Sequence, residues 1–527
     1  MGTAAYSMGE DYWENFNLQE EDIEFLYNYL LETETPLTSL ELVEALVKER
    51  IQRRKVEIEH QRMSGGDLYQ PKLSFKTGQK LTFSALDWKQ GIVVGVRPGH
   101  NPDLGEFQVI QVDFEDNLSR EFASNFADHK LNESPKLVED FDHLENKTVL
   151  SMYSDGLLDT LEEGLIGNPD FVRIAGRWFP RALLIDINMG HLNIAEAVLD
   201  MASGGPLPTT TLLDQIELSS EVNPKLLEFS LDLALQEDQR FDEVGPAGDT
   251  VWFLRRLEPA EVLNTPNFLN YQEIDYDRST LTPAMLDVEQ VLDDELTPFQ
   301  GKYPRLDQAE VRLIYPHWRS GTLPLSARTR HLFPTAYEAP RVRFMLVDGE
   351  TKGTFPGWVV REKRYVHGLQ EWYESHGVIP GSIIKVRKGD QPGQVIVQVD
   401  NRRPSRDWIR TLLVGSDGGT VFAMLKQIVS SPVDERMAIA IPDKKALDPL
   451  WETPSRDQQP FERVVVNTVR ELARLNPQSH VHITELYSAI NVTRRCPPGP
   501  ILALLASRPW FIHVGDLHYR LSDTDYE

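Results

Sequence analysis

The chain has 527 residues and a formal net charge of −27, from 54 Lys and Arg against 81 Asp and Glu. Since domains average about 100–200 residues, this length predicts several of them, and 41% apolar residues exclude wholesale disorder. An evenly acidic chain would repel nucleic acid and anionic membranes. The single cysteine, Cys496, excludes a disulfide framework and a cysteine-rich zinc site.

The same composition predicts a cytoplasmic protein without membrane contact. One cysteine fits a reducing compartment. The acidic N-terminus lacks the apolar segment of a signal peptide, and no stretch reaches the roughly 18 apolar residues of a membrane span.

Two kinds of pattern open the chain. Apolar periodicity predicts two helices within Asp22–Lys55. Short alternating strands follow between Phe75 and Phe126, with turns at Pro98-Gly99 and Asp116-Asn117. Their number and order predict a small barrel, similar to the KOW and Tudor class, which binds proteins or RNA; a purely structural use stays open.

A repeat then recurs along the chain. Three segments share one pattern, which is a helix end, F-x-x-V/I, a glycine-containing turn and an aromatic strand. They are Leu165–Phe179, Leu235–Trp252 and Leu505–Tyr519. Each therefore predicts a helix followed by a two-stranded hairpin. Two further helices precede the second and third segments, and helix, turn, helix, helix, hairpin is the order of a winged helix.

The middle unit, 191–259, resembles the HARE-HTH family of winged helices, which includes the delta subunit of bacterial RNA polymerase. The resemblance rests on Ile194–Leu199, Pro206–Ile216 and the ending Arg240–Gly245 with Trp252–Leu254. The C-terminal unit, 460–521, is similar to a more distant copy. Contact with DNA is one implication, but the acidic candidate face favours a protein partner, with RNA polymerase as one candidate. That face comprises Glu217, Glu221, Asp232, Glu237 and Asp238.

Charge changes sign in the second half of the chain. From Glu258 to Gly301 there are ten acids and one base, Arg278, which predicts an acidic linker, one that wraps another domain. Residues 302–410 carry 19 Lys and Arg against 11 Asp and Glu, a net of +8, so the remainder carries −35. The acidity therefore argues against nucleic acid for most of the chain, but not for this segment.

The basic segment resembles the plant-type DNA-binding pseudobarrel of auxin response factors. The shared features are Thr322–Pro334, a strand at Val342–Asp348, a Trp-bearing strand at Gly357–Arg361, and the helix Gln370–Ser375 before a further strand. The sequence departs from that family in a short second hairpin and in Ser382, where the family has Asp after Gly. The alternative is a β domain with a charged face.

That resemblance implies two basic arms that enter the major groove of DNA. The first arm would carry Arg319, Arg328, Arg330 and His331, and the second Arg361, Lys363 and Arg364. Cationic side chains are what contact with phosphate and guanine requires.

Catalytic signatures are missing from the sequence. It has no Gly-x4-Gly-Lys-Ser/Thr loop and no His-Glu-x-x-His pair. Asp348 with Glu350 and Lys352 is superficially similar to a nuclease core, but the two acids are too close together on a turn. We therefore predict a protein without enzymatic activity, metal or cofactor.

Together these observations predict a multidomain α+β protein with winged-helix repeats, a KOW/Tudor-like barrel and a pseudobarrel. The expected regions are a helical, partly winged-helix-like region 1–70, barrel 71–135, wing-like repeat 136–190, winged helix 191–259, acidic linker 260–301, pseudobarrel 302–410, an unassigned α/β region 411–455 and C-terminal winged helix 456–527. The expected function is binding of double-stranded DNA through 302–410 in transcription, with protein contacts elsewhere. A protein scaffold without nucleic acid and the recognition component of a restriction or defence system are the alternatives.

Overall fold

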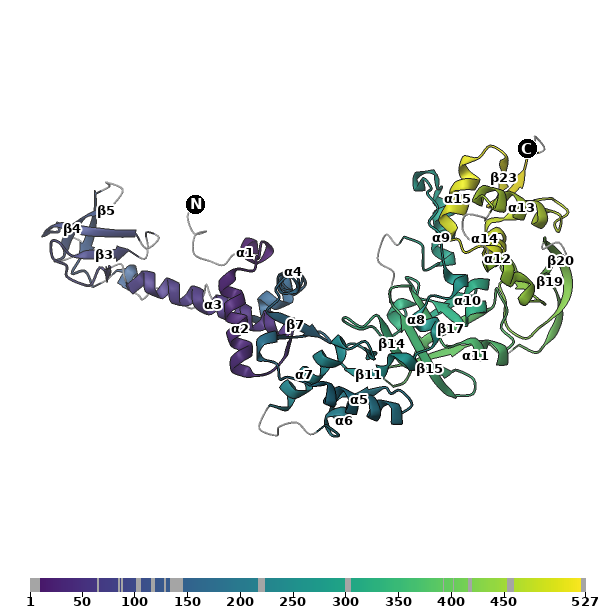
Figure 1. The fold of residues 1–527 in the computed structure, drawn as a ribbon. Helices are drawn as coiled ribbons and strands as arrows, with labels where there is room; N and C mark the ends of the chain where they lie inside the picture. The colour runs from purple at the N-terminus through teal and green to yellow at the C-terminus, as the bar shows by residue number, and fades with distance from the viewer. Residues whose placement is uncertain are drawn as a thin grey trace. The chain divides into compact units, whose positions relative to one another are not determined.

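The computed structural model of the chain describes residues 10–63, 66–83, 86, 89–100, 106–114, 119–127, 129–132, 146–216, 223–298, 305–391, 393–400, 402–415, 419–452 and 459–522. Over these ranges the fold is mixed α/β, with fifteen α-helices and six sheets (Figure 1). The chain divides into two compact units, 1–185 with 220–229, and 186–219 with 230–527. No helix within the described ranges combines the length and apolarity needed to cross a membrane.

The first unit contains a three-stranded sheet that joins two segments predicted as separate. Strand β1 pairs with β8, with Leu37 opposite Trp178, and the sheet order is β1-β8-β7. The hairpin of the wing-like repeat therefore completes the N-terminal helices, for which the sequence indicated no wing. The elements are α1 (Glu10–Glu14), α2 (Glu20–Thr33), β1 (Leu37–Thr38), α3 (Ser39–Met63), α4 (Asn146–Ile166), β7 (Phe171–Ile174) and β8 (Arg177–Pro180).

A five-stranded sheet is inserted between α3 and α4. Its order is β2-β3-β4-β5-β6, and its core contains Phe83, Val93 and Ile110. Hydrogen bonds from Asn125 and Phe126 to the carbonyls of Leu73 and Pro71 bring its two ends together, so the sheet is barrel-like. The predicted alternation is confirmed by β3 (Lys80–Phe83), β4 (Lys89–Pro98), β5 (Gln108–Phe114) and β6 (Ser119–Ser124), to which β2 (Asp67–Leu68) is added.

The middle repeat has the same order of elements as the first unit. Its sheet order is β10-β11-β9, and Leu207 of β9 lies opposite Trp252 as Leu37 lies opposite Trp178. Figure 1 labels its helices beside this small sheet. The elements are α5 (Met189–Met201), β9 (Leu207–Pro208), α6 (Thr209–Leu213), α7 (Pro224–Glu237), β10 (Phe241–Glu243) and β11 (Val251–Leu254).

The C-terminal repeat is a third instance of this arrangement. Its sheet order is β22-β24-β23, and Val481 lies opposite Tyr519. The elements are α13 (Phe461–Ala473), β22 (Val481–His482), α14 (Ile483–Thr493), α15 (Pro498–Ser507), β23 (Phe511–Gly515) and β24 (His518–Leu521).

The basic segment forms a seven-stranded sheet of order β12-β17-β18-β14-β15-β16-β13. Its pairs are antiparallel except for β14 with β18. The predicted strands and the predicted helix α11 are confirmed. The elements are β12 (Gln308–Arg312), α10 (Tyr315–Ser320), β13 (Thr322–Pro324), β14 (Arg341–Asp348), β15 (Thr354–Val360), β16 (Tyr365–His367), α11 (Gln370–Ser375), β17 (Ile383–Lys388) and β18 (Gln394–Gln398).

The acidic segment, for which we predicted a linker that wraps another domain, packs into the second unit. It forms α8 (Ala260–Leu263) and α9 (Pro283–Leu292), with short 3-10 turns between them. Val262 and Leu269 pack against Trp358, and Met285 joins the main core. Apolar residues spaced between the acids bury one side of the segment, which the charge count alone did not indicate.

The region 411–455, which we predicted as α/β without a fold assignment, contributes to a three-stranded sheet of order β20-β19-β21. Its first strand begins within 302–410, so the basic region contributes to two sheets. The elements are β19 (Ser405–Val414), β20 (Thr420–Val429), β21 (Ile439–Ala440) and α12 (Asp448–Glu452).

Candidate nucleic-acid interface

The two predicted arms lie next to each other at one end of the seven-stranded sheet. The first arm follows β13, and the second is the turn between β15 and β16. Strands β13 and β16 pair, with Pro324 opposite Tyr365, and the Leu325 N–H donates to the Arg364 carbonyl at 2.8 Å. The loop after β13 therefore starts beside the turn that carries the second arm.

Six of the seven predicted residues belong to these adjacent segments. Arg328, Arg330 and His331 lie on the loop after β13 and its 3-10 turn. Arg361, Lys363 and Arg364 lie on the β15–β16 turn, where Arg364 has a left-handed φ of 56°. Arg330, Lys363 and Arg364 are exposed.

Main-chain carbonyls hold four of these side chains in place. Arg328 donates to the Gln290 carbonyl at 2.9 Å, and Arg364 to the Glu295 carbonyl at 3.1 Å. His331 Nε2 lies 2.6 Å from the Leu306 carbonyl oxygen. A carbonyl contact by itself does not neutralise an arginine, because a carbonyl carries no net charge. The same holds for Arg361, which donates to the carbonyls of Ala339 and Tyr337. Arg328 also interacts with the Asp293 carboxylate.

Lys363 pairs instead with its neighbour in sequence. Its Nζ lies 2.9 Å from the Glu362 carboxylate, and both side chains are more than half exposed. A surface pair of this kind contributes little and exchanges readily with other anions.

Arg319 does not join the other six. It lies on α10, where its guanidinium forms an ion pair with Asp448 at 3.1 Å and sits over the Phe268 ring at 5.1 Å. Its contact with α12 is distant in sequence, so the resemblance placed it on an arm that the structure does not build there. We therefore drop Arg319 from the candidate interface.

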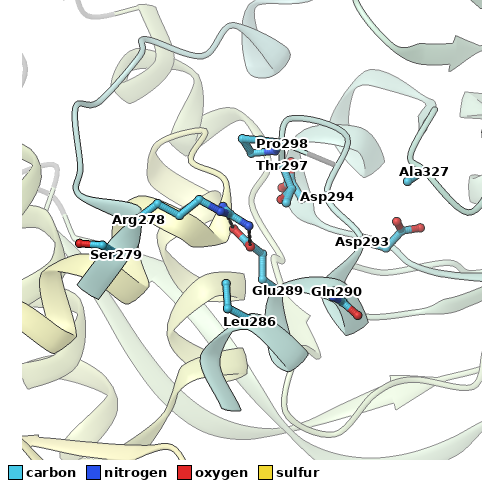
Figure 2. A pocket seen from close by; sticks show the side chains of 10 residues that line it. All are labelled: Arg278, Ser279, Leu286, Glu289, Gln290, Asp293, Asp294, Thr297, Pro298 and Ala327. Carbon is cyan, nitrogen blue, oxygen red and sulfur yellow. Dashed lines mark hydrogen bonds and ion pairs between the residues drawn. The ribbon is translucent and has the colours of Figure 1, made fainter. Parts of the chain in front are cut away.

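The acidic segment meets the arms directly. Besides the two carbonyl contacts, the Ser326 hydroxyl donates to the Asp293 carboxylate at 2.5 Å. Burial raises the pKa of Asp293 to about 6, although Ser326 and Arg328 act in the opposite direction. A cavity of about 370 Å³ lies where Asp293 and Gln290 face Ala327 of the first arm, and Figure 2 shows Arg278 reaching Glu289 on its other side.

The next two residues of that segment anchor it in the core. The Arg495 guanidinium bonds both oxygens of Asp294, at 2.8 and 2.7 Å, and Glu295 at 2.7 Å, with all three side chains at most 5% exposed. Tyr487 also donates to Asp294, and His317 lies 3.2 Å from Glu295. Burial would raise the pKa of Glu295, but Arg495 and His317 hold it well below its usual range. No sequence motif indicated this cluster.

The acidic face predicted for the middle repeat is only partly a surface. Asp232 is 4% exposed and accepts hydrogen bonds from Thr209 and from the Trp252 indole, so its role is structural. Asp238 pairs with Arg240, while Glu237 is exposed. The other two predicted members, Glu217 and Glu221, lie outside the described residues.

Comparison of the chain with protein-family models, with curated proteins and with solved structures found no match. The functional argument therefore rests on the geometry given above.

Proposed function

We propose that this chain is a modular, non-enzymatic protein that binds double-stranded DNA through the loop after β13 and the β15–β16 turn. In this proposal the seven-stranded sheet is a DNA-binding pseudobarrel, the three repeats are winged helices, and the five-stranded sheet is a KOW/Tudor-like barrel. The adjacency of the two predicted arms carries the proposal, since the Leu325–Arg364 hydrogen bond places cations from both on one edge.

Electrostatics supports this use of the edge. Arginines bonded to carbonyls keep their charge, and the carbonyl contact exchanges for a phosphate oxygen at small net cost. Each phosphate contact releases bound counterions, so binding should weaken steeply as salt increases. The interface comprises Arg328, Arg330, His331, Arg361, Lys363 and Arg364.

The repeats support a role in protein contact within the same proposal. Helix α15, the third helix of the C-terminal repeat, is largely buried and packs against α9, so it cannot enter a DNA groove. Helix α4 of the first unit carries Asp155, Asp159 and Glu163, which would repel phosphate. A protein partner, with RNA polymerase as one candidate, fits these faces, and transcription regulation is the role that we propose. Recognition for a restriction or defence system is a neighbouring role.

The decisive variant changes Arg328, Arg330, Lys363 and Arg364 together to alanine. Binding of a fluorescent duplex of about 20 base pairs is measured by anisotropy from about 50 to about 200 mM salt. We expect the variant to lose more than about tenfold in affinity and most of the salt dependence.

The matched control removes the same charge from the C-terminal repeat, with Arg470, Arg474, Arg508 and Arg520 changed to alanine. It should bind DNA like the unaltered chain. Equal binding by the two quadruple variants, or binding by the unaltered chain that is insensitive to salt, would overturn the proposal.

Asp293 offers a test of whether the acidic segment restrains the arms. Because Asp294 and Glu295 are core residues, deletion of the segment would unfold the unit, whereas Asp293→Asn keeps size and the Ser326 contact. Removal of a carboxylate near Arg328 should raise DNA affinity about threefold at pH 7.5 and less at pH 5, where Asp293 is already protonated. The anisotropy measurement above gives the DNA affinity at both pH values. If the affinity changed at neither pH, Asp293 would not restrain the arms.

A protein scaffold without nucleic-acid binding is the second candidate. It is favoured by the −35 outside 302–410 and by exposed apolar side chains on β19 and β20. The protein can be purified with its bound partners from the cells that produce it, with and without nuclease treatment. This comparison distinguishes the two candidate functions. Partners retained after nuclease, together with no binding of the duplex, would support the scaffold.

A further inference from the structure

Strand β20 is the uncovered edge of a long β-ribbon. It pairs with β19 in unbroken register from Ser405 opposite Val429 to Val414 opposite Thr420. In the sheet order β20-β19-β21, it has no second strand neighbour among the described residues. Figure 1 shows the two strands as one curved ribbon in the C-terminal half of the chain. A row of main-chain N–H and C=O groups therefore faces outward along β20.

The middle of this ribbon is apolar and exposed on both faces. Met424, Leu425 and Lys426 are consecutive exposed residues of β20, so neither face is covered there. Trp408 and Ile428 lie on the same face of the ribbon, and their side chains are 61% and 66% exposed. Natural edge strands are normally protected by prolines, bulges or several charges, and β20 has Lys426 as its only charge and no bulge.

Both ends of the ribbon are fixed to the rest of the unit. Leu412 and Phe422 belong to the main core, and Arg410 donates to the carbonyls of Arg436 and Glu435. Ile409 and Val429 pack with Ala438. The exposed stretch is thus held in an extended conformation before any partner arrives, which lowers the entropy cost of binding.

The charge on the ribbon indicates which kind of segment it would accept. Arg406 and Lys426 are exposed, and Lys426 sits 5.4 Å from the Trp408 ring centre. The one acid of the strand pair, Asp407, is already bonded to Arg402. A second copy of the same edge would bring like charges together, whereas an acidic segment would complement them.

We propose that the β20 edge is a docking site for an extended, acidic segment of a partner protein with apolar side chains at alternate positions. The partner strand hydrogen-bonds to the β20 main chain. Its apolar side chains pack on the face of Val421 and Leu425, and its acidic side chains lie on the opposite face, beside Lys426. This binding mode is strand addition, in which the backbone gives affinity and alternate side chains give specificity. It is independent of the DNA interface.

Synthetic peptides of about ten residues, the length of β20, test this on the full-length protein. One fluorescent peptide alternates valine with glutamate, and a second alternates valine with lysine. A third is the glutamate peptide with alternate backbone nitrogens methylated, so that one edge cannot donate. We expect the glutamate peptide to bind at least about tenfold more tightly than the other two in an anisotropy titration.

A double variant, Val421→Glu with Leu425→Glu, locates the binding on the ribbon, because it places carboxylates where the apolar side chains of the partner would pack. It should weaken binding of the glutamate peptide by at least about tenfold. The control, Ile166→Glu with Met201→Glu, alters residues that are 68% and 89% exposed elsewhere and should leave binding unchanged. Circular dichroism of both variants establishes that they are folded.

Three results would overturn the inference. The first is equal binding of the glutamate and lysine peptides, the second is full binding of the methylated peptide, and the third is equal binding by both double variants. A concentration-dependent dimer in sedimentation that dissociates only in the ribbon variant would assign the edge to a second copy of the chain, and so would also reject an acidic partner. None of these results depends on whether the protein binds DNA.

Discussion

The middle and C-terminal repeats share one topology but stabilise it differently. In the middle repeat, the Trp252 indole donates to Thr209 Oγ1 at 3.1 Å and to Asp232 Oδ1 at 2.9 Å. In the C-terminal repeat, Tyr519 takes the place of Trp252, and the helix after the short strand starts at Ile483 where the middle repeat has Thr209. The middle repeat therefore has a hydrogen-bonded polar network beneath its aromatic residue, whereas the C-terminal repeat has apolar side chains there.

The first unit shows that the polar network is a repeated feature. There the Trp178 indole donates to Ser39 at 3.0 Å, and Ser39 donates to Glu162 at 2.6 Å. Tryptophan, a hydroxyl at the start of the second helix and a carboxylate on the third thus recur in two repeats. The C-terminal repeat lacks this set and has its buried charges on another side, where Arg495 holds Asp294 and Glu295 of the acidic segment.

This difference relates the position of polar groups to the use of a repeat. An internal network specifies one packing of a unit's own helices. A buried ion pair between Arg495 and the acidic segment specifies instead how the C-terminal repeat attaches to its neighbours. The same fold therefore serves as a self-contained unit in one place and as a docked part of a larger core in another.

Among the tests of this difference between the repeats, removal of Arg495 should have the largest effect on stability. Arg495→Ala leaves Asp294 and Glu295 buried without their cation, which costs about 3–5 kcal/mol of stability. Chemical denaturation followed by tryptophan fluorescence measures this change, and the transition of the C-terminal half should move to lower denaturant.

The matched control is Arg474→Ala, which breaks the ion pair with Glu471 on the surface of the same repeat. An exposed pair of this kind contributes about 0–1 kcal/mol. If Arg495→Ala destabilised the protein no more than this control, the buried cluster would not be what attaches the repeat.

Local features of the fold were predictable from sequence, because turn residues and short-range alternation specify them. The Gly-containing turns located all three hairpins, and the alternation from Val342 to Asp348 located β14. What could not be predicted were partners distant in sequence. The hairpin of the first unit lies beyond an inserted barrel-like sheet, so no short pattern linked Leu37 to Trp178.

In the candidate site, too, local patterns were predictable and contacts between distant residues were not. The two loops could be placed because they connect recognisable strands, and six of the seven predicted residues lie on them. That these residues contact DNA stays a prediction. Arg319 could not be placed, since its partner Asp448 is 129 residues away. Charge was also misleading for Asp232 and for the acidic segment, because a carboxylate in sequence has the same appearance whether it faces solvent or a buried tryptophan.

A pH titration sharpens the comparison at equivalent positions of two repeats. Glu243 lies opposite Trp252, as His513 lies opposite Tyr519, but Glu243 is partly buried and His513 is exposed. Burial, with the nearby carboxylates of Glu338 and Asp232, raises the pKa of Glu243 to about 8. The folded state therefore holds a proton that the unfolded state releases near pH 4.5, so the free energy of unfolding should fall as pH rises from about 4.5 to about 8.

Glu243→Gln should flatten this pH dependence by about 2 kcal/mol, since glutamine keeps the shape and the contact with the Gly245 N–H. Urea denaturation at pH 5 and pH 8 supplies the two values for each protein. His513→Gln, at the equivalent exposed position, is the control and should leave the difference between the two pH values as it was. An equally steep fall in the Glu243→Gln protein would show that this carboxyl is not its source.

The smallest expected change in stability comes from altering the aromatic residue above each core, Trp252 in the middle repeat and Tyr519 in the C-terminal repeat. Trp252→Phe removes the indole N–H from Thr209 and Asp232 and should cost about 1–2 kcal/mol, because a buried carboxylate loses a donor. Tyr519→Phe removes a hydroxyl from a core that does not depend on a polar network, and it should cost less than about 0.5 kcal/mol. Both values come from denaturation curves at pH 7. Similar losses in the two variants would mean that the network contributes no more than ordinary packing, and the difference between the repeats would then be one of shape alone.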